Sequence, residues 1–164
     1  MIKNMIEEKL NSLGIALQRP SKTAGSYLPV VKSRNLVFVS GQLPIELGSK
    51  TVKVKFQGKV GRDISISDGK QAAKLCTINA LAHLKEALSS LDHIKRFVKL
   101  SGFVNCDASF TSHPEVINGA SDFLVQLFGE KGRHSRVAVG MSSLPFDSAV
   151  EIDFIVERNG TLRY

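Results

Sequence analysis

Arg136 stands at the start of the alternating segment RVAVGM, and this setting makes it the first candidate for chemistry in the chain. Side chains alternate between the two faces of a strand, so Arg136, Ala138 and Gly140 are expected on one face. One arginine followed by two small residues is typical of a solvated edge. It is equally typical of the floor of a small pocket with a guanidinium directed into it.

A carboxylate in the following predicted strand, AVEIDFIVE, provides a possible partner. The apolar residues of that strand alternate onto one face, so Glu151 and Asp153 share the other. If the two strands pair, Glu151 and Arg136 can lie near the same surface. A guanidinium binds a carboxylate through two parallel hydrogen bonds, and a glutamate can take a proton from water. The pair therefore suits a small anionic substrate, although a plain cross-strand salt bridge explains the same spacing.

Four other residues are weaker candidates, each with a structural alternative. Ser40 and Gly41 end the predicted strand NLVFVSGQLP, where Gly41 permits either close approach of a ligand or a simple bend. Tyr27 lies in a loop, where a tyrosine often serves as a packing lid. Asn118 lies inside a predicted helix that it disfavours, which indicates a polar contact for its side chain.

Composition limits the class of protein. The chain has 164 residues, 43% hydrophobic and 23% charged, which predicts one globular domain over 1–164. The apolar runs are too short to span a membrane, and Glu7 and Glu8 replace the apolar run of a secretory signal. Ile2, Ile6, Leu10 and Leu13 instead indicate an amphipathic helix within residues 1–17. We expect a cytosolic protein.

The distribution of basic residues, histidines and cysteines argues against a nucleic-acid-binding protein and against a metalloprotein. The formal net charge is +7, but the basic residues are dispersed and do not alternate with aromatic residues, so we expect no nucleic-acid partner. The four histidines lack metal-ligand spacing, and Cys76 and Cys106 have no metal-like neighbours. We expect two ordinary reduced cysteines and no metal site.

The predicted element order is a leading helix followed by ββαβαββ. The strand NLVFVSGQLP and the segment TVKVKFQG are expected to pair as a hairpin. A long helix is expected from Asp68 and a second from Ser112 to Gly129, with the strand RFVKLSGFVN between them. This order favours an α+β fold with a mixed sheet and two long helices on one face. The other face also carries apolar residues, which predicts a homo-oligomer.

The segments SGQLP and HSRVAVGMSSLPFDSAVEIDFIV closely resemble the RidA/YjgF family, also labelled L-PSP endoribonuclease or translation-inhibitor proteins. The ending is the most specific part, with an arginine eight residues before Leu-Pro and a glutamate seven after that leucine. The likeness extends from about Leu17 to Glu157 and is greatest to the longer branch of the family. It implies a chorismate-mutase-like fold, a homotrimer, and sites in clefts between subunits.

The resemblance also implies an activity that needs no cofactor. It is the hydrolysis of 2-imino acids, such as 2-iminopropanoate and 2-iminobutanoate, to 2-oxo acids and ammonia. By position, Arg136 matches the substrate-carboxylate clamp, Glu151 the acid that holds the attacking water, and Tyr27 the tyrosine beside the imine. The matches among pocket-lining residues are Ser40, Gly41, Asn118 and Ala138. RidA itself often has a cysteine at the place of Ala138, so thiol chemistry there is lost.

Three hypotheses about function follow. The first is an imine deaminase that acts on small 2-imino acids. The second is a non-catalytic trimer that binds small carboxylates. The third is an endoribonuclease, against which the sequence offers no histidine pair, metal cluster or basic stripe.

Overall fold

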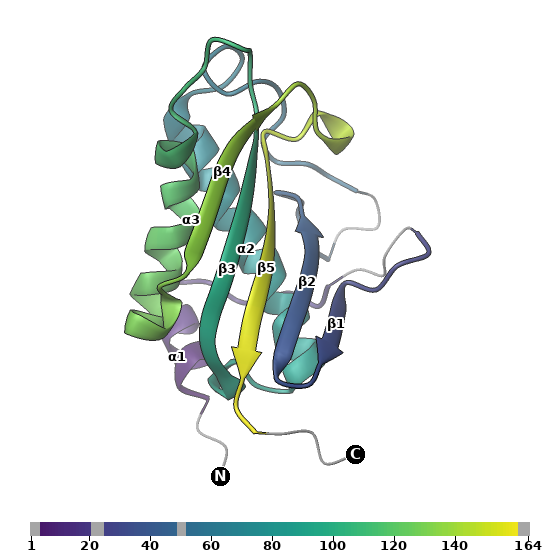
Figure 1. Cartoon of the computed structure of the whole chain (residues 1–164), viewed down its shortest axis with the longest axis vertical. Coiled ribbons are helices and arrows are strands. Elements are labelled where there is room, and N and C mark those ends of the chain that lie inside the picture. The colour runs from purple at the N-terminus through teal and green to yellow at the C-terminus, as the bar shows by residue number, and fades with distance from the viewer. Residues whose placement is uncertain (1–3, 21–24, 49–51, 161–164) are drawn as a thin grey trace.

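The computed structural model describes residues 4–20, 25–48 and 52–160 and shows a five-stranded sheet with two long helices on one side (Figure 1). The strands are β1 (Val30–Ser33), β2 (Leu36–Gln42), β3 (Ile94–Asn105), β4 (Ser135–Met141) and β5 (Val150–Arg158). Their order across the sheet is β1-β2-β5-β3-β4. Only the β3–β4 pair is parallel. The predicted α+β class with a mixed sheet is confirmed.

The two long helices, α2 (Ile66–Leu88) and α3 (His113–Phe128), cover one face of the sheet and bury its apolar residues. Helix α2 begins earlier than the predicted Asp68. Its N-cap is Ser65, whose hydroxyl accepts a hydrogen bond from the Asp68 backbone N–H at 3.0 Å. Asp68, the predicted start, is therefore the third residue of the helix. For α3 the predicted start at Ser112 and the end at Gly129 are both confirmed.

The N-terminal helix is shorter than predicted. Helix α1 covers Met5–Ser12 and packs beside α3, with Ile6 and Leu10 buried. Leu13 is exposed because Gly14, at φ +72°, turns the chain directly after the helix. Ile2, which the pattern also assigned to the apolar face, lies outside the described residues.

The predicted hairpin between NLVFVSGQLP and TVKVKFQG is wrong. Strand β2 pairs with β1 and β5 instead, and β1 is a strand that the sequence analysis did not predict. After Pro44 the chain makes a short antiparallel contact of Ile45 with Val54, which is an isolated bridge outside the five strands. Val52 is exposed there. Val54 and Phe56 are partly buried, so the alternation correctly indicated an inner face but not which strand the segment would pair with.

The last two strands also do not pair with each other. Both are neighbours of β3, which lies between β4 and β5. Two short 3₁₀ helices flank β4: η2 (Gly129–Gly132) joins it to α3, and η3 (Pro145–Asp147) joins it to β5. The connection after β4 thus leads across β3 rather than into an adjacent strand. Strand β4 is consequently an edge strand.

Candidate functional site

Arg136 lies on β4 and reaches the helix that packs beside that edge. Its Nη1 donates to Asn118 Oδ1 at 2.8 Å and to Ser121 Oγ at 3.1 Å. Asn118 and Ser121 are one helical turn apart on α3, so both side chains face β4. The polar contact expected for Asn118 is therefore present. Within the described chain, the side-chain hydrogen bonds of Arg136 both use Nη1, and the residue is exposed.

A chain of hydrogen bonds extends from Arg136 to a histidine. Because Ser121 Oγ accepts from Arg136, its hydroxyl proton can be donated to His134 Nε2, 3.0 Å away. His134 Nδ1 then donates to the Gly132 carbonyl at 2.7 Å, which fixes a neutral tautomer. Burial, together with the nearby guanidinium, lowers the pKa of His134. The histidine is therefore neutral at physiological pH and holds Ser121 in position for Arg136.

Glu151 lies on the opposite face of the sheet, against β2. A Cβ at Gly41 would overlap its Oε1, so only glycine leaves room for this carboxylate. Gly41 also lies within the irregularity of β2 between Val39 and Gln42, which agrees with the bend considered for it. The group close to its backbone is Glu151 of the same chain. Burial, with a contribution from Asp153, raises the pKa of Glu151 above its ordinary value of 4.5.

The remaining predicted residues lie near these two. Ala138 follows Arg136 on the same face of β4 and packs against the core. Ser40 lies beside Gly41 and donates through its hydroxyl to the Leu28 carbonyl at 2.7 Å, which fastens the segment before β1 to β2. Tyr27, in that segment, is 56% exposed.

Arg136 and Glu151 do not share a surface within one chain, contrary to the expectation. Arg136 stands opposite Leu100 of β3, whose fully buried side chain marks the helix-covered face. Glu151 stands opposite Phe103, on the uncovered face. The predicted residues thus form two separate groups, called half-sites below. The arginine half comprises Arg136, Asn118 and Ala138 at the β4 edge, and the glutamate half comprises Glu151, Ser40, Gly41 and Tyr27 around β2 and β5.

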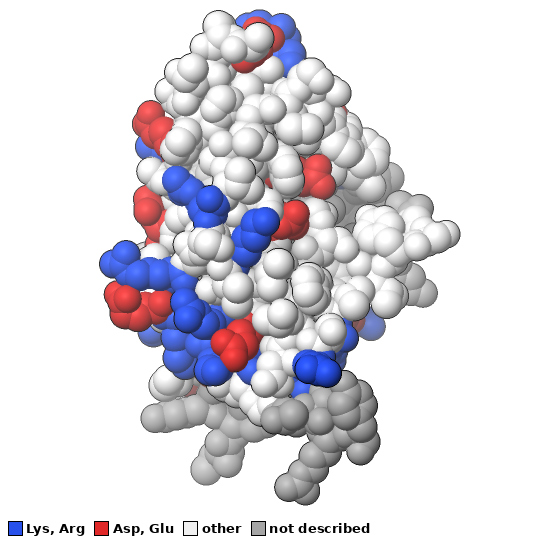
Figure 2. All heavy atoms as spheres, viewed as in Figure 1, with Lys and Arg blue, Asp and Glu red and all other residues white. Residues whose placement is uncertain are grey.

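A group of basic side chains lies on the uncovered face of the sheet (Figure 2), whereas Arg136 projects from the helix-covered face. Figure 2 shows Lys and Arg side chains gathered on the lower left of the uncovered face, over the start of β3 and the turn before β4. The exposed basic residues of this region are Lys95, Arg96, Lys99, Lys131 and Arg133. Part of this positive charge is neutralised, because Lys95 pairs with Glu157 at 2.7 Å and Arg133 pairs with Glu130 at 2.9 Å.

Over residues 4–20, 25–48 and 52–160, no group of three His, Cys, Asp or Glu side chains is arranged to hold a metal ion. Within the same ranges, no helix has the length and apolarity needed to cross a membrane.

Sequence reasoning missed the two residues that support Arg136. Ser121 could have been found, because it lies three residues after Asn118 and so shares its helix face. His134 lies two residues before Arg136, but its contact with Ser121 depends on how η2 places β4 beside α3. It also missed that Cys106, assigned to a polar turn, is buried and lies 3.4 Å from His113 Nε2.

Comparison with known proteins identifies the fold family. The family described as "YjgF/chorismate mutase-like, putative endoribonuclease" matches residues 7–157. Protein TCP17 of Trypanosoma cruzi is 41% identical over 155 residues, 94% of each chain. The crystal structure of protein Atu1372 from Agrobacterium tumefaciens is 46% identical, with a TM-score of 0.86 over 94% of this chain and 93% of that one.

A RutC family protein of Pyrococcus abyssi is 30% identical over 141 residues, 86% of this chain and 93% of the relative. These matches extend over nearly the whole described fold, and the resemblance noted in the sequence is confirmed. The chain belongs to the YjgF family of chorismate mutase-like proteins.

Proposed function

We propose that this protein hydrolyses small 2-imino acids, such as 2-iminopropanoate and 2-iminobutanoate, to 2-oxo acids and ammonia. The arrangement around Arg136 carries the proposal. Its guanidinium is exposed, is oriented by Asn118 and Ser121, and lies on the same face of β4 as the small residue Ala138. A guanidinium that is hydrogen-bonded to the protein through one nitrogen retains N–H donors on its other nitrogens for a ligand carboxylate.

Glu151 supplies the second function that the reaction needs. In the proposed reaction, a water attacks the imine carbon while the Glu151 carboxylate accepts one of its protons. The same carboxyl returns that proton to the nitrogen, which gives a tetrahedral carbinolamine. The carboxyl then transfers the proton of the new hydroxyl to the nitrogen, and the C–N bond breaks to release ammonia as the C=O bond of the 2-oxo acid forms. A raised pKa makes Glu151 a better base than an ordinary carboxylate and a usable acid. Because an imine is already electrophilic, positioning and one activated water suffice.

The two half-sites are brought together in the proposed assembly, a homotrimer. Within one chain they lie on opposite faces of the sheet and are separated by β3. A head-to-tail ring of identical chains would place the β4 edge of one subunit against β2 and β5 of the next. Partly exposed apolar residues on the uncovered face support such contacts: Leu36, Phe38, Val137, Val139 and Met141.

The activity is tested by measuring ammonia release from 2-iminopropanoate and 2-iminobutanoate, generated in situ by an amino-acid oxidase. The rate must exceed spontaneous hydrolysis, and Arg136→Ala should abolish the excess. Arg133→Ala is the matched control, because Arg133 is exposed nearby and bonds only Glu130 among the described residues. Full activity in Arg136→Ala would refute the carboxylate clamp. A folded wild type that binds 2-oxo acids without turnover would instead be a non-catalytic carboxylate binder.

Shared sites are tested by mixing two inactive variants. Arg136→Ala lacks the arginine half and Glu151→Gln lacks the glutamate half, so neither should work alone. In co-expressed mixed trimers, about one quarter of the sites would pair an intact arginine half with an intact glutamate half. Recovery of about a quarter of wild-type activity is expected. A mixture as inactive as its parents would show that the sites are not shared.

A further inference from the structure

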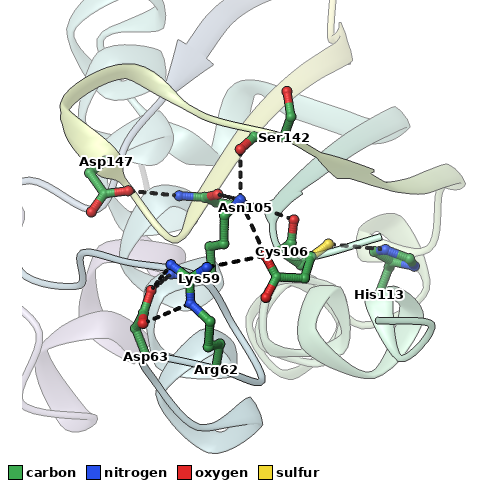
Figure 3. Close-up of polar contacts among 9 residues, drawn as sticks. Lys59, Arg62, Asp63, Asn105, Cys106, His113, Ser142 and Asp147 are labelled. Atoms are coloured by element: carbon green, nitrogen blue, oxygen red, sulfur yellow. Dashed lines mark hydrogen bonds and ion pairs between the residues drawn. The ribbon is translucent and has the colours of Figure 1, made fainter. Parts of the chain in front are cut away.

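Cys106 and His113 form a thiol–imidazole pair outside both half-sites. Cys106 follows directly after β3, and His113 is the first residue of α3. The distance from Cys106 Sγ to His113 Nε2 is 3.4 Å, and Figure 3 shows the two side chains directed toward one another. The His113 ring is itself held edge-on against Phe110, with 5.3 Å between ring centroids. This is the geometry of a nucleophile with a base in hydrogen-bond reach.

The backbone around the thiol is fixed from two directions. The Cys106 N–H donates to the Met141 carbonyl at 3.2 Å, and the Cys106 carbonyl accepts from Lys59 Nζ at 3.1 Å (Figure 3). Gly140 then covers the pair. A Cβ at Gly140 would lie 2.6 Å from His113 Nε2 and 2.9 Å from Cys106 Sγ, so a larger residue there would displace at least one of the two side chains.

The pair lines a surface hollow of about 450 Å³. Its other walls include Phe110, Met141, Ser142 and Asp107, which combine apolar surface with polar groups. The second cysteine is in the opposite situation. Cys76 is fully buried in α2, and its Sγ lies 3.6 Å from the Val150 carbonyl. A solvent-borne reagent can therefore reach the hollow beside Cys106 but not Cys76.

We propose that Cys106 is a reactive thiol and that the hollow admits a small disulfide, which forms a mixed disulfide with it. The Cys106 S–H gives its proton to His113 as Sγ attacks one sulfur of the incoming disulfide. The disulfide bond breaks, the new Cys106–sulfur bond forms, and the departing thiolate takes the proton from His113. One thiol and one disulfide thus yield one mixed disulfide and one thiol, with no other oxidant.

Burial explains why this thiol needs a partner. It raises the pKa of Cys106, so the sulfur is protonated at neutral pH and is a weak nucleophile alone. A base at hydrogen-bond distance removes this limitation, because the proton leaves as the new bond forms. The reaction rate should therefore depend on His113.

The test measures thiopyridone release from native protein treated with 4,4′-dithiodipyridine. Wild type should release one equivalent rapidly and a second only after unfolding in guanidinium. Cys106→Ser should lose the rapid equivalent, and His113→Ala should slow it by about 10- to 100-fold. Gly140→Ala should also slow it, because the added methyl separates the pair. Val139→Ala is its control, on the same strand but the opposite face.

Circular dichroism and thermal melting establish that each variant is folded. Peptide mapping after treatment with oxidised glutathione gives a second measurement on wild type alone, and the adduct should be on Cys106. A native protein that reacts only at its global unfolding rate would overturn the proposal. So would a rapid equivalent that survives in Cys106→Ser, or an undiminished rate in folded His113→Ala. None of these readouts depends on imine hydrolysis.

Discussion

Arg136 and Lys59 are cations at the two ends of β4, and the chain holds them in opposite ways. Lys59 Nζ donates to Asn105 Oδ1, the Cys106 carbonyl and the Ser142 carbonyl at 2.7–3.1 Å, and its side chain is 18% exposed. These three bonds use all the protons of the ammonium. Arg136 is exposed and, among the described residues, is bonded through Nη1 alone.

The difference separates a structural cation from one available to a ligand. The ammonium of Lys59 joins the loop before α2 to the ends of β3 and β4, and it has no donor left for a substrate. Side chains of α3 orient Arg136 but leave N–H donors of its guanidinium available. A guanidinium suits this second role because its five N–H groups can be divided between protein and ligand.

Among the variants, Arg136→Lys should have the largest effect on catalysis. It keeps the positive charge but removes the paired N–H donors of the guanidinium, so kcat/KM for imine hydrolysis should fall about 100-fold. The thermal midpoint should hardly change, because the residue is exposed. Steady-state kinetics and melting curves check both statements, with Arg133→Lys as the control. If Arg136→Lys kept wild-type kcat/KM, these paired donors would not be the feature that binds substrate.

Lys59→Met should lower the stability of the fold but leave imine hydrolysis unchanged. Three acceptors lose their donor, so the free energy of unfolding should fall by about 2 kcal/mol. The folded protein should retain imine hydrolysis, because Lys59 contacts neither half-site. Urea unfolding measures the first effect. Lys55→Met is the control, since the Lys55 side chain is 45% exposed and its ammonium pairs with Glu46. If Lys59→Met and Lys55→Met lowered the free energy of unfolding equally, the three hydrogen bonds of Lys59 would make no additional contribution to stability.

Of the two cations compared, Arg136 could be recognised from local patterns in the sequence. The period of two along β4 correctly placed Arg136 and Ala138 on one face, and the unfavourable position of Asn118 in a helix correctly indicated a polar contact. Both inferences need only neighbours within one element. The sequence analysis did not single out Lys59, because its three partners come from the ends of two strands distant in sequence.

The failures have the same physical origin. Arg136 and Glu151 were expected near one surface if their two strands paired, but β3 lies between those strands. Strand order depends on which faces α2 and α3 can cover, and alternation within a strand carries no information about it. Cys106 and His113 are seven residues apart, and their contact requires the intervening turn to close under Gly140.

A smaller effect is expected at the support of Arg136. Ser121→Ala removes one of the two acceptors of Nη1 and breaks the link to His134. KM for the imine should rise about fivefold with kcat nearly unchanged, because the guanidinium is less well positioned but still present. Ser135→Ala is the control, since Ser135 lies next to Arg136 and donates to the Val98 carbonyl. A purely structural role for Ser121 would lower the thermal midpoint and leave KM unaltered.

The smallest expected effect is on the pH dependence of thermal stability, and it concerns the carboxyl group of Glu151. Burial raises the pKa of Glu151, so between 4.5 and that raised pKa the folded chain binds more protons than the unfolded one. The stability contributed by the protonated carboxyl is complete below pH 4.5 and is lost as pH rises through the folded pKa. Glu151→Gln should therefore raise the thermal midpoint slightly at pH 7, and the gain should vanish below pH 4.5.

Glu46→Gln is expected to act in the opposite direction. Lys53 lowers the pKa of the exposed Glu46, so its ionised form favours the folded chain at neutral pH. Thermal melts of both variants at pH 7 and below pH 4.5 compare the two signs. A lower midpoint for Glu151→Gln at pH 7 would mean that the ionised carboxylate stabilises the fold. Glu151 would then resemble Lys59, a charge held for structure, rather than Arg136.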